Sequence, residues 1–202
     1  MDELELIRKL KAGDEPAFEQ LVDDYGKKIY STALRILGDA DAAQDASQDV
    51  FLKIYGAAAS FKGNSALSTW IYRITVNVCL DSKRRQRRLK LYTPPDGGED
   101  EDPQARLPDP SPRPDEAYES RETRAEILDA LKMLDDDQRT AVVLRDIQGL
   151  SYIEAAEAMG CAEGTFKSRL SRARGNLREI LSERGNFFAR PASKSVKEGE
   201  RS

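Results

Sequence analysis

Hydrophobic residues recur at steps of three and four along two parts of the chain, which is the spacing of one face of an α-helix. The longest repeat covers residues 18–37, between Asp14, which suits a helix start, and Gly38, which suits a helix end. Further repeats predict helices at residues 4–10, at residues 42–55 after a cap at Asp41, and at residues 67–78. No stretch alternates as a half-buried strand does, so this part of the chain is predicted to be all-α.

The second apolar part is also helical by its period. Residues 127–134 and 135–147 predict two helices, and a capping box at Ser151 predicts the start of a third, short helix. Gly160 then turns the chain into a longer helix, predicted from Thr165 to Ser182.

This last helix separates apolar from polar residues. About a third of its circumference is apolar, and the rest carries Lys167, Ser168, Arg169, Ser171, Arg172, Arg174 and Arg178. A short helix, a glycine turn and a basic helix form a helix-turn-helix, whose second helix enters the major groove of DNA. The amides of Gly164 and Thr165 can face a phosphate. The same pattern also fits an ordinary helix with a solvated basic face.

An acidic, proline-rich stretch separates the two helical parts. Seven of the nine prolines fall within residues 93–120, where nine acids and two bases give a net charge of −7. Such a segment has too little apolar surface to fold alone. We therefore predict an all-α protein of two small helical domains, residues 1–92 and 121–185, with an extended linker at 93–120 and a flexible tail at 186–202.

The composition argues against catalytic and metal sites. The 202 residues include no histidine, and the two cysteines, Cys79 and Cys161, are too far apart to form a CxxC pair. We expect reduced, structural cysteines, no catalytic residue, no metal and no cofactor. No apolar run approaches the roughly 18 residues of a membrane span, so a cytoplasmic location is expected.

The net charge of −4 conceals segments of opposite sign. Residues 72–92 carry seven bases and one acid, a net charge of +6, and follow Phe61 and Trp70 closely. Positive charge with aromatic surface is what single-stranded nucleic acids require, although Trp70 fits a core position better. Residues 39–51 form an acidic helix face that suits a basic partner. Each of these features also fits a plain solvated helix surface.

In chain order, the acidic helix, the segment FKGNSALSTWIYRITVN with basic residues after it, the linker and the helix-turn-helix closely resemble the extracytoplasmic-function sigma factors of bacteria. The stretches AFEQLVDDYGKKIY, DASQDVFLKIY, STWIYRITVN and LSYIEAAEAMGCAEGTFKSRLSRARGNL are similar to the conserved domains two and four of that family. The resemblance implies an alternative sigma factor, a subunit without enzymatic activity that directs RNA polymerase to promoters and helps to melt them.

The resemblance also implies three binding surfaces. Docking on the clamp helices of the largest polymerase subunit would use Asp45, Gln48, Asp49 and Phe51. Binding of the minus-ten element, with one base flipped into a pocket, would use Phe61, Lys62, Gly63, Asn64, Ser65, Ile74, Asn77, Lys83, Arg84, Arg85, Arg87 and Arg88. Reading of the minus-thirty-five element would use Gly164, Thr165, Lys167, Ser168, Ser171, Arg172 and Arg174.

The implied partners are core RNA polymerase, at its clamp helices and its flap, promoter DNA, and an anti-sigma factor, which would hold the chain at the inner membrane if it were membrane-bound. No small-molecule substrate is implied. Two elements about 25 base-pair steps apart are separated by roughly 85 Å, which an extended linker of 28 residues and the two domains can span. One rival is an independent helix-turn-helix regulator, which would bind DNA tightly without polymerase. Another rival is an enzyme with an accessory DNA-binding domain, but the sequence offers no catalytic nucleophile paired with a general base.

Overall fold

The computed structural model describes residues 3–92 and 125–183, and the regular elements in these two ranges are all helical. The predicted all-α fold class is thereby confirmed. The first domain consists of α1 (Glu3–Lys11), α2 (Glu15–Leu37), α3 (Ala40–Ala57), the 3-10 turn η1 (Ala58–Ser60) and α4 (Leu67–Tyr92). The predicted linker, residues 93–120, and the predicted tail, residues 186–202, lie outside the described residues.

Local capping explains where α2 begins and ends. Asp14 accepts a hydrogen bond of 2.9 Å from the backbone N–H of Ala17, and this satisfies one of the free donors of the first turn. Gly38 ends the helix with a φ of +77°, and its N–H donates to the carbonyl of Leu34. Both ends are therefore where the sequence predicted them.

The cap of α3 differs from the prediction. Asp39, and not Asp41, has the extended backbone of an N-cap, and its side chain accepts a hydrogen bond of 2.7 Å from the N–H of Ala42. Asp41 lies inside the first turn, where a carboxylate still favours the positive end of the helix. The two aspartates share the same chemistry, so spacing alone did not distinguish them.

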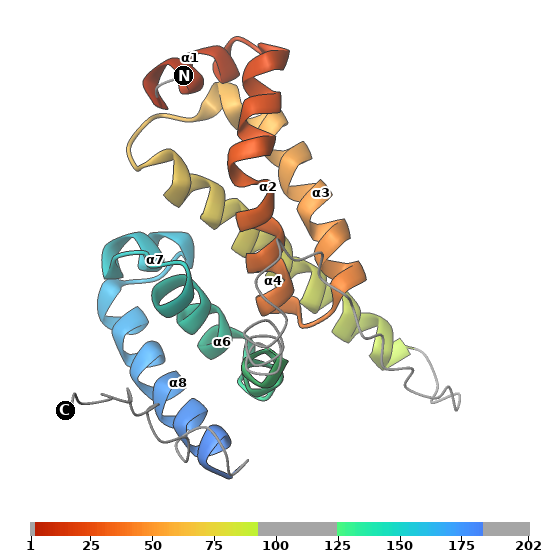
Figure 1. Cartoon of the computed structure of the whole chain (residues 1–202), viewed down its shortest axis with the longest axis vertical. Helices are drawn as coiled ribbons and strands as arrows, with labels where there is room; N and C mark the ends of the chain where they lie inside the picture. The colour runs from red at the N-terminus through yellow and green to blue at the C-terminus, as the bar shows by residue number, and fades with distance from the viewer. Residues whose placement is uncertain (1–2, 93–124, 184–202) are drawn as a thin grey trace, which may run out of the picture.

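Helices α2, α3 and α4 pack against one another mainly through aliphatic side chains (Figure 1). Leu21, Ile29, Val50, Ile54 and Ile71 are among the most deeply buried residues of this core. Cys79 is buried in the same core as a free thiol, and burial raises the pKa of this thiol to about 12.

The second domain begins with helical residues 125–132 and continues with a compact helical group. Its elements are α6 (Asp136–Val142), the π-helical turn η2 (Val143–Ile147), α7 (Tyr152–Ala158) and α8 (Glu163–Glu183). The capping box at Ser151 and Glu154 is present as predicted, and Gly160 turns the chain with a φ of +62°. Helix α8 begins at Glu163, two residues before the predicted start at Thr165.

The second domain packs on one side of the first (Figure 1). Helix α7 lies against α4, and α6 lies near the end of α2. At Gly38 the two domains approach closely, since an added Cβ would lie 3.0 Å from the side chain of Lys132. This interface was not anticipated from the sequence, and it pairs charged side chains of the two domains.

Candidate functional site

An exposed acidic stripe runs along α3. Asp45, Gln48 and Asp49 follow one another at helical spacing, and all three are exposed to solvent. Leu52 extends the stripe by one more turn and is 70% exposed, and it was not among the predicted site residues. The spacing could have predicted this position, because residue 52 is three residues after Asp49 and seven after Asp45 and therefore lies on the same side of the helix.

Phe51 lies on a different side of α3. Its ring is half-buried and packs edge-on against Phe18 of α2, with ring centroids 6.2 Å apart. Phe18 also contacts Tyr55, whose ring is 5.2 Å away and largely exposed. Phe18 and Phe51 therefore join α2 to α3, whereas Leu52 and Tyr55 stay largely exposed.

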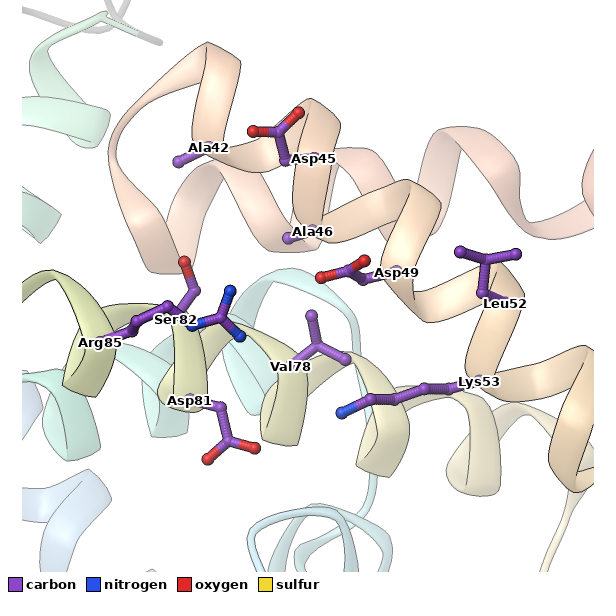
Figure 2. A pocket seen from close by; sticks show the side chains of 10 residues that line it. All are labelled: Ala42, Asp45, Ala46, Asp49, Leu52, Lys53, Val78, Asp81, Ser82 and Arg85. Carbon is purple, nitrogen blue, oxygen red and sulfur yellow. The ribbon is translucent and has the colours of Figure 1, made fainter.

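A groove of about 430 Å³ lies between α3 and α4 (Figure 2). Asp45, Asp49 and Leu52 line it from α3, and Val78 and Arg85 line it from α4. Figure 2 shows the Arg85 side chain directed along α4 into this groove. Arg85 was predicted to bind the minus-ten element, and the structure places it beside the acidic stripe.

The loop between η1 and α4 has a buried anchor and an exposed polar tip. Phe61 is only 6% exposed, and its ring packs on Trp70 with centroids 5.0 Å apart. Lys62, Gly63 and Asn64 are exposed at the tip, where Gly63 has a φ of +73°. This conformation suits glycine, which has no Cβ to clash. The ring of Phe61 thus holds the loop, while the residues after it face solvent.

The outer face of α4 carries an exposed polar row. Asn77, Arg84 and Arg88 are exposed at helical spacing, and Arg73 begins the same row four residues before Asn77. Arg73 belongs to the basic run but was not among the predicted site residues. The side chains of Ile74 and Ser65 are half-buried. Arg84 forms an exposed ion pair of 2.8 Å with Asp81, a type of contact that is weak in water.

Two of the cations predicted to bind the minus-ten element pair with the second domain, and the Arg87 side chain stays 70% exposed in its pair. Lys83 and Arg87 each lie 2.5 Å from a carboxylate oxygen of Asp136, which begins α6 in the second domain. Burial lowers the pKa of Lys83, and the hydrogen bond to Asp136 opposes that shift. The sequence did not reveal this contact, because 53 residues separate Lys83 from Asp136.

Helix α8 places the predicted reading residues on its solvent side. Phe166, Leu170 and Ala173 are buried against the other helices, as their spacing predicted. The exposed side carries Lys167, Ser168, Ser171 and Arg172, and the exposed residues Gly164 and Thr165 form the first turn. The helix-turn-helix geometry therefore leaves this face open to a duplex.

Arg174 and Lys167 have partners within the second domain. Arg174 makes a two-pronged contact with Asp146, at 3.0 Å and 2.5 Å, which raises the pKa of the guanidinium. Lys167 pairs with Glu163 at 2.6 Å one turn earlier and lies 5.5 Å from the centre of the Tyr152 ring. Arg172 is exposed and makes no such contact with any described residue.

Within residues 3–92 and 125–183 there is no cluster of three side chains suited to hold a metal ion. In the same ranges, no helix is long and apolar enough to cross a membrane.

Family models place this chain among the bacterial sigma factors. Residues 21–89 match the model described as Sigma-70 region 2, and residues 124–177 match the model described as Sigma-70, region 4. These matches fall on the two helical domains described above.

Curated relatives make the assignment more specific. The RNA polymerase sigma-H factor of Pseudomonas aeruginosa is 37% identical over 88% of this chain and 92% of its own length. The ECF RNA polymerase sigma-E factor of Escherichia coli is 36% identical over 84% of this chain and 88% of its own length. The ECF sigma factor SigE of Mycolicibacterium smegmatis is 33% identical over 88% of this chain, which spans 66% of that relative.

Two solved structures have a similar fold. The sigma factor RpoE from Bartonella quintana, crystallised with the anti-sigma factor NepR, has a TM-score of 0.66 and 31% identity, over 82% of this chain and 96% of that one. CnrH, solved with the cytosolic domain of CnrY, is 24% identical and shares the fold, with a TM-score of 0.64 over 90% of this chain and 97% of that one. The chain belongs to the extracytoplasmic-function (ECF) RNA polymerase sigma factors, which confirms the family and function that the sequence motifs predicted.

Proposed function

We propose that this sigma factor binds core RNA polymerase through the acidic stripe of α3 (Asp45, Gln48 and Asp49) together with Leu52. The observation that carries the proposal is the exposure of these four residues on one side of a single helix. Carboxylates beside an exposed leucine suit a basic surface with an apolar area next to it, since burial of a leucine side chain is favourable. The clamp helices of the largest polymerase subunit are the proposed partner.

Promoter DNA is the proposed partner of the remaining surfaces. The loop tip at residues 62–64 and the outer row of α4 would bind the minus-ten strand, with Asn77 as a hydrogen-bonding group for an unstacked base. The exposed side of α8 would read the minus-thirty-five element, because arginine, lysine and serine match base edges in the major groove. Residues 1–92 and 121–185 would then act as two DNA-binding domains, with polymerase holding them apart.

An anti-sigma factor is a further proposed partner. The solved relative from Bartonella quintana was crystallised with such a factor, and this supports the same kind of regulation here. We place the protein in the cytoplasm, where polymerase and promoter DNA are found, and expect it to act as a regulatory subunit without catalysis of its own.

The polymerase contact is tested by reversing the charge of the stripe. The double variant Asp45→Lys/Asp49→Lys should lose binding to core polymerase in a pull-down assay, because its stripe would repel a basic partner. The control is Glu19→Lys/Asp23→Lys, which makes the same charge change on exposed positions of α2. Equal binding by both variants and the wild-type chain would contradict the proposed surface.

Transcription reconstituted with core polymerase, followed by mapping of start sites across a genome, tests the whole function. The wild-type chain should direct initiation at a defined set of sites that share two sequence elements. Tight, specific DNA binding without polymerase would instead favour the independent regulator.

A further inference from the structure

The loop that joins η1 to α4 lies against the first helix of the chain. We call residues 61–66 the minus-ten loop, because the proposed function assigns the exposed tip of this loop to the minus-ten strand. Helix α1 packs against η1, beside this loop (Figure 1), and buries Leu6 and Leu10 in the core of the first domain. The first and last residues of α1, Glu3 and Lys11, contact the two ends of the loop.

Glu3 supplies a helix cap that the sequence next to α4 lacks. The carbonyl of Ala66 accepts a hydrogen bond from the N–H of Trp70, the first of the helical pattern, so Ala66 occupies the cap position. An alanine side chain has no oxygen that could accept a hydrogen bond from the first turn. A carboxylate oxygen of Glu3 accepts one instead, at 3.2 Å from the backbone nitrogen of Leu67. Its negative charge also suits the positive end of the helix dipole.

Lys11 lies at the other end of the same loop. Its ammonium nitrogen is 6.0 Å from the centre of the Phe61 ring, at the outer edge of the range over which a cation attracts an aromatic face. Trp70 of α4 packs on the same ring, with centroids 5.0 Å apart. Phe61 is therefore held from α4 and from α1, and Lys11 makes the weaker of the two contacts.

Helix α1 limits how far the two ends of the loop can move apart. From Glu3 to Lys11 the nine helical residues rise by about 12 Å. The six residue steps from Phe61 to Leu67 could extend to about 20 Å without such a restraint. Because one helix contacts both ends, it favours a single arrangement of the exposed tip at residues 62–64. Selective binding of a base requires polar groups that are held in place before the base arrives.

We propose that α1 is a positioning element for the minus-ten loop, in which Glu3 and Lys11 hold the loop in the arrangement that binds an unstacked base. The proposal rests on the proposed function, from which it takes the base-binding role of the loop tip. Neither residue was among the predicted site residues, and neither is required to touch DNA. Such a role differs from general stabilisation of the fold, since it changes how one base is bound relative to its neighbours.

The test is an abasic scan with holoenzyme formed from core polymerase and the full-length chain. The probes are single strands that carry the minus-ten sequence of a mapped promoter, with one base removed at a time. Wild-type holoenzyme should lose the most affinity at one position, that of the captured base. In Glu3→Ala, the ratio of this loss to the mean loss at the neighbouring positions should fall about fivefold, the equilibrium factor of a typical helix cap. A general loss of folded protein would lower every affinity and leave the ratio unchanged.

Two further variants test whether the cap is the cause. Ala66→Ser in the Glu3→Ala background supplies a local oxygen at the cap position and should restore the ratio. Glu3→Gln should keep most of the ratio, because the amide oxygen can accept the same hydrogen bond. The control Glu19→Ala removes a carboxylate from an exposed position of α2 and should behave as the wild type.

A wild-type ratio in Glu3→Ala overturns the proposed role of Glu3, and so does failure of Ala66→Ser to restore a lowered ratio. If Glu3→Ala fails to fold, Lys11→Met decides alone. Its ratio should fall, whereas that of Arg8→Met, which removes a cation from the same last turn of α1, should not. Equal ratios in these two variants overturn the proposal. A flat scan with wild-type holoenzyme would instead overturn the base-binding role in the proposed function, so the two failures are distinguishable.

Discussion

Arg139 of α6 donates a hydrogen bond to the carbonyl oxygen of Ile36, the penultimate residue of α2, although 103 positions separate them in sequence. The same guanidinium donates to three more carbonyls at the end of helical residues 125–132 and just after it. They belong to Leu131, Lys132 and Leu134. Arg139 is only 5% exposed, and burial lowers its pKa. One buried side chain therefore caps the ends of two helices in different domains.

Replacing Arg139 with methionine should destabilise the protein. The change keeps a long apolar stem but leaves four carbonyl oxygens without their donor, at a total cost of about 2–4 kcal/mol. Urea denaturation followed by circular dichroism measures the loss. Arg172→Met, at an exposed position of α8, is the control and should stay within about 0.5 kcal/mol of the wild type. Similar stability of the two variants would show that the buried contacts of Arg139 contribute little.

Asn77→Ala should weaken promoter melting more than closed-complex formation. The exposed amide is proposed to bond a base that has left the stack, and such a base exists only after melting begins. Permanganate footprinting reports melting, and a gel-shift assay with holoenzyme reports the closed complex. Gln86→Ala changes an amide on the opposite side of α4 and should affect neither step. Equal loss of both steps in Asn77→Ala would refute the role in the pocket.

Arg172→Ala should reduce the preference for the upstream promoter element. Loss of an arginine that contacts base edges costs about 1–3 kcal/mol of discrimination. The measurement is competition between a mapped promoter and the same promoter with its upstream element scrambled. Arg178→Ala removes the same charge from another exposed position of α8 and serves as the control. A variant that retained full discrimination would exclude Arg172 as a reading residue.

Leu52→Ser should weaken binding to core polymerase while leaving the fold intact. Because Leu52 is already 70% exposed, its loss removes little burial from the sigma factor itself. Full burial of a leucine side chain contributes about 1.5–3 kcal/mol, so partial burial at an interface should contribute about 1–2 kcal/mol. Leu4→Ser is the matched control, since Leu4 is 81% exposed on α1, away from the acidic stripe. Titration of core polymerase with each labelled variant gives the affinities, and equal affinity would remove Leu52 from the proposed surface.

Local features of the chain were predictable because their causes are local. The helix from Asp14 to Gly38, the capping box at Ser151 and the apolar side of α8 follow from spacing and from hydrogen bonds between near neighbours. The wrong predictions concerned helix ends and were off by two residues. Helix α3 is capped by Asp39 instead of Asp41, and α8 starts at Glu163 instead of Thr165. The placement of the charged runs also followed from the order of residues alone.

The sequence by itself determined the helical elements, the two domains that the family models match and the membership of the sigma factor family, since periodicity, capping and motif order need no knowledge of distant contacts. Only the tertiary structure decided which predicted site residues are buried and which lie against charged groups of other helices. It buried Phe61, directed Arg85 toward the acidic stripe and paired Lys83 and Arg87 with Asp136. Those outcomes depend on how helices far apart in the chain pack together, and neither the composition nor the spacing of a charged run encodes its partner across a domain interface.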